Sequence, residues 1–103
     1  MFFEANVRYH FEMTKSRFLQ ITKALGDARR LEIFQRIAAD GGEISCIDLR
    51  ARIPLARATI SHHVKELATA GLIDRRRRSK FMYLRVRLEN WNEYLKYLSR
   101  LAP

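Results

Sequence analysis

Apolar residues recur at helical spacing through most of the chain, and short polar or glycine stops divide them into separate elements. A first helix is predicted from Thr14, a suitable N-cap, to Gly26, and its inward face would hold Phe18, Ile21, Thr22 and Leu25. Asp27 is suited to cap a second helix that ends at residues 40–42, with Leu31, Phe34, Ile37 and Ala38 pointing inward. Residues 1–13 show no clear period and are interpreted as an arm or the start of a helix.

Two short helices follow across a tight turn. Ser45 and Asp48 have the spacing of a capping box, and the helix they open would turn Cys46, Leu49 and Ile53 inward. Pro54 ends it, because the residue before a proline is pushed out of the helical region. After a three-residue connection, residues 57–70 form a fourth helix closed by Gly71. This arrangement is a helix–turn–helix unit.

The pattern changes after Gly71. Residues 72–76 and 80–87 are predicted to form a hairpin, in which Phe81, Tyr83 and Val86 favour a strand, and Glu43 with Ile44 could add one small strand. A last helix over residues 89–101 carries an apolar stripe wider than a small core needs, so part of it is expected to bury against a second subunit. The fold class is mainly α with a small β-hairpin, containing about five helices and two to three short strands.

Composition narrows the class of protein further. The chain has 103 residues, enough for one domain, and 20 Lys and Arg against 11 Asp and Glu give a net charge of +9. A hydrophobic share of 48% is that of a globular chain. The single cysteine excludes an intramolecular disulfide, and neither a membrane span nor a signal-peptide core is visible, so a cytoplasmic protein with no segment inside a membrane is expected.

The basic residues are clustered. Seven of the 20 lie between Gly71 and Arg87, opposed only by Asp74. The predicted hairpin tip, a loop without anions to pair with, is Arg75, Arg76, Arg77, Arg78, Ser79 and Lys80. Concentrated positive charge on a folded domain indicates a nucleic acid or an anionic membrane surface as partner.

The fourth helix separates into two faces. Ile60, Val64 and Leu67 are predicted to face the core, with His63 on the inner flank. The other side would present Arg57, Ala58, Thr59, Ser61, His62 and Lys65. Short polar side chains near its start allow close approach to base edges in a groove about 12 Å wide, while Arg57 could contact guanine or phosphate and Lys65 phosphate. A merely solvated helix face is the alternative, and the adjacent basic hairpin favours DNA binding.

Several ordered motifs resemble the ArsR/SmtB family of small winged-helix repressors. They are Leu-Gly-Asp-Ala-Arg-Arg-Leu-Glu-Ile at 25–33, Thr-Ile-Ser-His-His-Val-Lys-Glu-Leu at 59–67, Ala-Gly-Leu-Ile at 70–73 and Tyr-Leu-Arg-Val at 83–86. The resemblance covers about residues 16–100. This sequence departs from the family pattern at three positions. Ala28 stands where proline is usual, Ser79 stands where the wing often has glycine, and Ala56 offers no capping oxygen where serine is common.

The resemblance implies a homodimer on duplex DNA. The first and last helices would pair through Phe18, Ile21, Leu25, Trp91, Tyr94, Leu95, Leu98 and Leu101. The recognition helices would enter successive major grooves of a roughly palindromic operator, with half-sites about 34–36 Å apart, and the arginine hairpin would be the wing. Repression would last until an effector lowers the affinity for DNA.

Neither metal nor cofactor is expected. Many relatives hold a thiophilic metal through Cys-x-Cys in the third helix, but here Ser45 and Ile47 stand at the ligand positions and Cys46 lies between them. Cys46 is interpreted as a buried small hydrophobe. No histidine follows His63, so the terminal-helix site of other relatives is also missing, and the rings of His62 and His63 should diverge. His10, near Glu4 and Glu12, is interpreted as a surface residue.

No enzyme motif is present in the sequence: there is no phosphate-binding glycine loop and no nucleophile with an evident base. The favoured function is a DNA-binding transcriptional regulator, most simply a repressor. An RNA-binding or protein-docking winged helix, which grips a backbone without reading bases, is the alternative. The effector, the operator and the choice between repressor and activator stay open.

Overall fold

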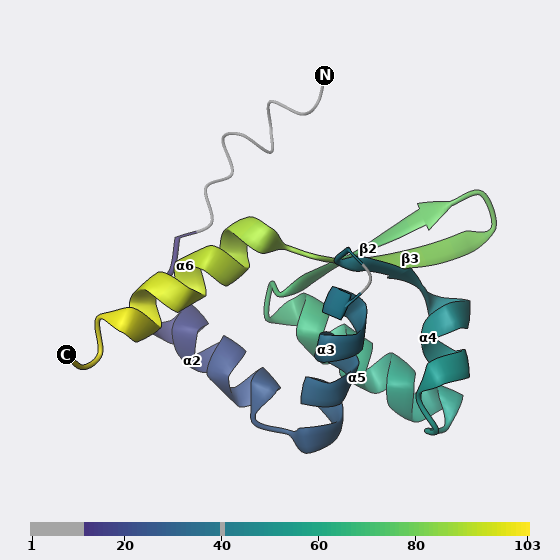
Figure 1. The fold of residues 1–103 in the computed structure, drawn as a ribbon, viewed down its shortest axis with the longest axis horizontal. Helices are drawn as coiled ribbons and strands as arrows, with labels where there is room; N and C mark the ends of the chain where they lie inside the picture. Colours follow the sequence, from purple (N-terminus) through teal and green to yellow (C-terminus); the bar gives the residue numbers. More distant parts are fainter. Residues whose placement is uncertain (1–11, 40) are drawn as a thin grey trace.

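The computed structural model describes residues 12–39 and 41–103, and these form five helices and one three-stranded sheet (Figure 1). In chain order the elements are α2 (Lys15–Leu25), α3 (Ala28–Ala39), β1 (Glu43–Ser45), α4 (Cys46–Arg52), α5 (Arg57–Thr69), β2 (Ile73–Arg78), β3 (Phe81–Val86) and α6 (Leu88–Ser99). The predicted fold class is confirmed. The predictions for residues 1–11, including Glu4 and His10, and for Asp40 lie outside the described residues.

Short polar side chains start three of the helices, as predicted. The hydroxyl of Thr14 accepts a hydrogen bond from the backbone N–H of Arg17 at 3.1 Å, which caps α2. Asp27 and Ser45 accept equivalent bonds at 3.0 and 3.1 Å, which cap α3 and α4. These caps satisfy donors that a helix start otherwise leaves without partners. Ala56 precedes α5 and supplies no such bond.

One core joins the helices to the inner face of the sheet. The strand order is β1-β3-β2, with both pairings antiparallel. Ile44 lies opposite Leu84, and Ile73 lies opposite Val86, so these four buried residues share the face on which α3 and α5 pack. The apolar side chains with no exposed surface are Ile21, Ile33, Ile37, Leu49, Leu67, Leu72 and Leu84.

The predicted inward faces of the first two helices need correction. In α3, Leu31 is 38% exposed and Ala38 is exposed, whereas Ile33 is fully buried. Ile33, Phe34 and Ile37 still share one helical face, and α3 packs against α2, α4, α5 and the sheet, while Leu31 and Ala38 lie beside that face rather than on it. In α2, Ala24 is buried and Thr22 is exposed.

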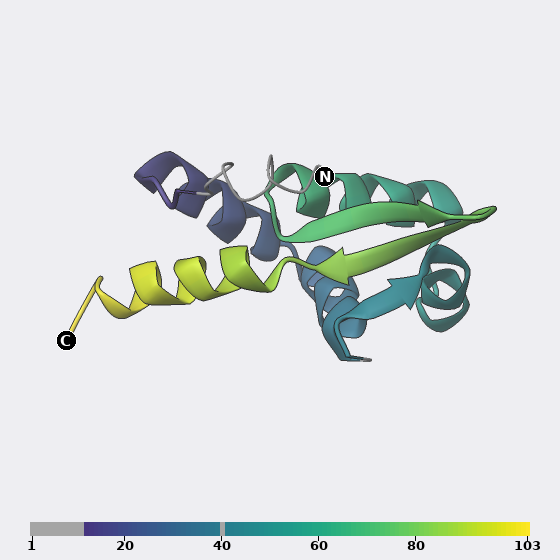
Figure 2. The ribbon, with the colours of Figure 1, turned by 90° about the horizontal axis from the view of Figure 1, so that it is seen from above.

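The two ends of the molecule differ in structure. Helices α2 and α6 lie together at one end, while the hairpin of β2 and β3 projects at the opposite end (Figures 1 and 2). Phe18 stacks on Tyr94 and on Tyr97, with ring centroids 5.1 and 4.2 Å apart, and the hydroxyls of Thr22 and Tyr94 are hydrogen-bonded at 2.9 Å. Among the described helices, none is long and apolar enough to cross a membrane.

Candidate nucleic-acid interface

The helix–turn–helix consists of α4, a four-residue connection and α5. α5 is anchored in the core by Ile60, Val64 and Leu67, and His63 is 8% exposed beside them. The outer side of α5 exposes Arg57, Ala58, Thr59, Ser61, His62 and Lys65. The predicted division of this helix into two faces is therefore confirmed, and the exposed set lies on a helix whose opposite face is buried in the core.

Arg30 is a structural residue that the sequence analysis did not single out. Its Nε donates to the carbonyl of Ala24 at the end of α2, at 2.8 Å, and its Nη1 lies 3.3 Å from Nδ1 of His63. One guanidinium thus connects α2 to the middle of α5. His62 and His63 have ring centroids 5.7 Å apart, one exposed and one buried, so they do not converge on a common ligand.

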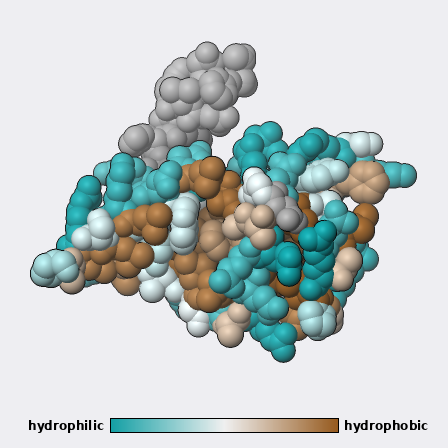
Figure 3. Space-filling view, in the orientation of Figure 1, coloured by the Kyte–Doolittle hydropathy of each residue, from teal (hydrophilic) through white to brown (hydrophobic). Residues whose placement is uncertain are grey.

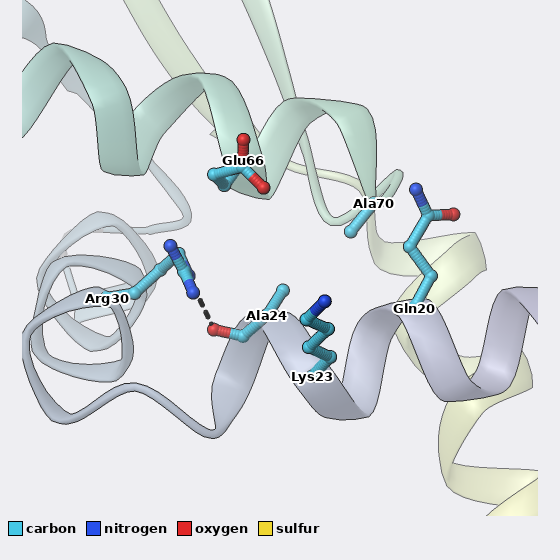
Figure 4. Close-up of a pocket in the computed structure, with 6 residues that line it drawn as sticks. All are labelled: Gln20, Lys23, Ala24, Arg30, Glu66 and Ala70. Atoms are coloured by element: carbon cyan, nitrogen blue, oxygen red, sulfur yellow. Dashed lines mark hydrogen bonds between the residues drawn. The ribbon is translucent and has the colours of Figure 1, made fainter.

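A cavity of about 170 Å³ lies beside this connection (Figure 4). Two cations, Lys23 and Arg30, and one carboxylate, Glu66, line it together with Gln20, Ala24 and Ala70. Figure 4 shows these side chains converging from α2, α3 and α5. Opposite charges partly cancel there, so the cavity is not a strong attractor for either sign of ligand.

Arg77 and Arg78 lie on a strand rather than in the tip loop, which corrects the predicted end of the strand at residue 76. β2 continues to Arg78, and the turn consists only of Ser79 and Lys80. β2 stays paired with β3 up to its last residue, since Arg77 lies opposite Met82 and Arg78 lies opposite Phe81. Residues on a strand alternate between its two faces, so the four arginines do not form one patch.

The register assigns each arginine to a face. Arg75 lies opposite the buried Leu84, so Arg75 and Arg77 share the sheet face on which α3 and α5 pack. Arg76 and Arg78 share the outer face. All four are exposed, as are Ser79 and Lys80.

Anions accompany part of the wing, contrary to the prediction of a hairpin tip without partners. The Arg78 guanidinium pairs with Glu43 of β1 and lies over the Tyr83 ring, 4.3 Å from its centroid. Asp74 pairs with Arg85 and Arg87 at 3.3 and 3.4 Å. Glu43 was missed because it is 35 residues away in sequence and reaches the wing only through the pairing of β1 with β3.

The remaining wing cations are uncompensated. Within the described residues, Arg75, Arg76, Arg77 and Lys80 form no ion pair. The wing therefore carries ion pairs around Asp74 at its base and at Arg78 near its turn, and four of its cations have no carboxylate partner among the described residues. Such a surface gains free energy when it approaches a polyanion, since phosphates supply the missing partners and counterions are released.

Two groups near α4 and α3 show altered acidity. Partial burial raises the pKa of the Cys46 thiol, against smaller opposing effects of Arg50 and Arg75. Hydrogen bonding from the backbone N–H of Arg30 lowers the pKa of Asp27. Across residues 12–39 and 41–103, no three His, Cys, Asp or Glu side chains gather into a possible metal site.

Comparison with known proteins places this geometry in a family. Residues 25–76 match the profile of a family described as a helix-turn-helix domain. The chain is 36% identical over 76 residues to an uncharacterized HTH-type transcriptional regulator, YceK, of Bacillus subtilis, covering 74% of this chain and 76% of that protein. It is 38% identical over 66 residues to a putative arsenical resistance operon repressor, ArsR2, of Halobacterium salinarum, covering 63% of this chain and 55% of that one.

A solved structure shares the fold. The homodimeric winged helix-turn-helix DNA-binding domain Mb0332 of Mycobacterium bovis, a possible ArsR-family regulator, superimposes with a TM-score of 0.67 at 21% identity, covering 87% of both chains. The fold, the matched helix-turn-helix profile and the sequence relatives all indicate the same kind of protein. The chain belongs to the ArsR family of winged helix–turn–helix transcriptional regulators.

Proposed function

We propose that this protein is a homodimeric repressor that reads a roughly palindromic operator, with α5 in the major groove and the wing on the flanking backbone. The observation that carries the proposal is that an exposed face of a helix anchored in the core lies beside a strand on which Arg75, Arg76 and Arg77 form no ion pair with a described residue. Thr59 and Ser61 are short enough for base edges to approach the helix, and Arg57 offers a guanidinium suited to guanine. Arg75, Arg76, Arg77 and Lys80 supply contacts to phosphate.

The dimer is proposed from the apolar surface at the other end. Leu19, Leu95, Leu98 and Leu101 are 40–60% exposed, and Figure 3 shows hydrophobic surface along α6. Phe18, Ile21 and Tyr94 are buried inside the protomer, so they support these helices from within rather than offering free contact surface. Leu25 and Trp91 are half-buried and complete the expected interface. A second copy would cover the exposed leucines, in the way that the Mycobacterium bovis relative is described as a homodimer.

We further propose that the effector is not a soft metal bound at α4. Ser45 begins the helix with its hydroxyl engaged as a cap, Ile47 is exposed and apolar, and only Cys46 carries a thiol. A single thiol cannot supply the two or three thiolates that a soft metal requires, and partial burial, which raises the pKa of Cys46, adds to the cost of forming even one.

A gel-shift experiment tests the proposal. The purified protein is titrated against DNA from its own promoter, random duplex of equal length and structured RNA, over a series of salt concentrations. Tighter binding to the promoter than to random duplex at every salt concentration is expected. Equal affinity for all three nucleic acids would contradict operator recognition and favour a winged helix that grips any backbone.

A further inference from the structure

Asn90 is a fully buried polar residue near the start of α6, and its amide is only half satisfied. It has no exposed surface, and its Nδ2 donates to the carbonyl of Gly71 at 2.7 Å. Its Oδ1 is buried, and no protein group within residues 12–39 and 41–103 donates a hydrogen bond to it. A buried acceptor left unpaired costs free energy, on the order of 1–3 kcal/mol, so an apolar residue of similar size would suit this core position better for stability alone.

The partner of Asn90 lies at a junction. Gly71, with φ of 85°, is where α5 has ended and the chain turns into β2. A second bond joins the same two regions, from the backbone N–H of Arg87 to the carbonyl of Leu72 at 2.9 Å. The beginning of α6 is therefore tied to the end of the recognition helix and the base of the wing by these two hydrogen bonds and by the ion pair of Arg87 with Asp74. Of these, only the bond from Asn90 comes from a side chain within α6.

The two elements joined in this way have different proposed tasks. α6 carries Leu95, Leu98 and Leu101 on its exposed side, and α5 carries the groups for base contacts. In a two-fold dimer, the angle between α6 and α5 within a protomer sets the distance and rotation between the two recognition helices. A small change of that angle is doubled across the symmetry axis.

We propose that Asn90 is a positioning residue that holds α6 at a fixed angle to α5 and thereby sets the half-site spacing that the dimer accepts. The inference rests on the proposed function, because it requires a dimer that binds two half-sites. Asn90 itself touches no DNA. It acts through Gly71, and its amide contributes orientation rather than stability.

The test compares Asn90→Leu with the wild type. Asn92→Leu is the matched control, since Asn92 is exposed on the same helix. Duplexes are first selected from a random library by the wild-type protein, and the selected half-sites are then placed at the preferred spacing and at one and two base pairs more or less. Each added base pair rotates one half-site by about a tenth of a turn.

The wild type and Asn92→Leu should prefer one spacing by about tenfold or more, comparable to the effect of one mismatched base pair. For Asn90→Leu this preference should approach unity, while the half-site sequence and the dimer seen in sedimentation are retained. A lower Tm with unchanged spacing preference would overturn the proposal, because that is the signature of a purely structural residue.

Two further outcomes are separable. If Asn90→Leu does not fold, Asn90→Ser shortens the side chain and removes its reach to Gly71, and an unchanged spacing preference in that variant equally overturns the proposal. If the wild type itself selects no paired half-sites, the proposed operator recognition fails, and the claim for Asn90 fails with it for a visibly different reason.

Discussion

The recognition helix and the wing carry their polar groups on different kinds of support. α5 is seated in the core by three apolar residues, with His63 tied to Arg30 behind it, and its exposed half holds mostly short or uncharged side chains. The outer half of the wing is a two-stranded ribbon whose side chains are mainly arginine and solvent-exposed. The contrast indicates two tasks: base discrimination needs fixed geometry, whereas attraction to phosphate needs charge and tolerates movement.

The largest effect that separates the two tasks should come from the wing. Replacing Arg75 and Arg77 together with alanine removes two uncompensated cations on the face shared with the helices. Affinity for every duplex is expected to fall on the order of 100-fold, and the slope of log affinity against log salt should become shallower by about 1.8, since each lost phosphate contact contributes about 0.9. Fluorescence anisotropy across a salt series measures both.

Lys96 and Arg100 provide the control for this change. They lie on or just beyond α6, at the opposite end of the molecule, and their joint replacement by alanine alters the net charge equally (Figure 1). The control should leave the salt slope unchanged. A loss confined to one operator sequence in the wing variant would mean that these arginines read bases, and the division of tasks would be wrong.

A smaller and more selective effect is expected on α5. Arg57→Ala should reduce discrimination at one base pair of each half-site by about 1–3 kcal/mol, with little change in salt slope, because a bidentate contact to guanine carries sequence information. Lys65→Ala, on the same exposed side, is the comparison and should weaken all sequences alike. Binding to all single-base variants of a selected operator measures the difference. Uniform weakening by Arg57→Ala would show that Arg57 contacts only phosphate.

Local sequence signals predicted most of what positions the interface. The caps at Thr14, Asp27 and Ser45 act within three residues, and the buried stripe of α5 repeats along one helix, so neighbouring residues were sufficient to recognise them. Leu31 was misplaced because Leu31 and Ile33 could each belong to an apolar stripe with Phe34 and Ile37, and only the packing of α3 against α2, α4, α5, β1 and β3 decides between them.

Contacts between distant segments could not be predicted in this way. The pairing of Arg78 with Glu43 depends on the register of β1 with β3, and the bond from Asn90 to Gly71 depends on where α6 begins in space. In the sequence, Arg78 is one of four equivalent arginines and Asn90 is an ordinary helix residue. Their roles arise only when the sheet and the last helix are assembled.

The pairing of Arg78 with Glu43 gives a third way to probe the wing. Glu43→Gln should release Arg78 for phosphate and steepen the salt slope by up to about 0.9, with a modest rise in affinity for all duplexes. An exposed ion pair contributes at most about 1 kcal/mol, so the fold should be retained. Glu32→Gln raises the net charge equally on an exposed site of α3 and is the control. Equal slopes for both variants would show that Arg78 already reaches DNA or never does.

The smallest effect concerns the turn that closes the wing. Ser79 has φ of 57°, in the left-handed region that glycine adopts without steric cost. A side chain there costs about 1–2 kcal/mol, while glycine adds about 0.5–1 kcal/mol of unfolded-state entropy, so Ser79→Gly should stabilise the fold by about 0.5 kcal/mol. Thermal unfolding should show a Tm higher by about 2–4 °C. A lower Tm would mean that the Ser79 hydroxyl contributes more to the hairpin than its backbone conformation costs. The wing would then have a more fixed geometry than attraction to phosphate needs, which would weaken the contrast with α5.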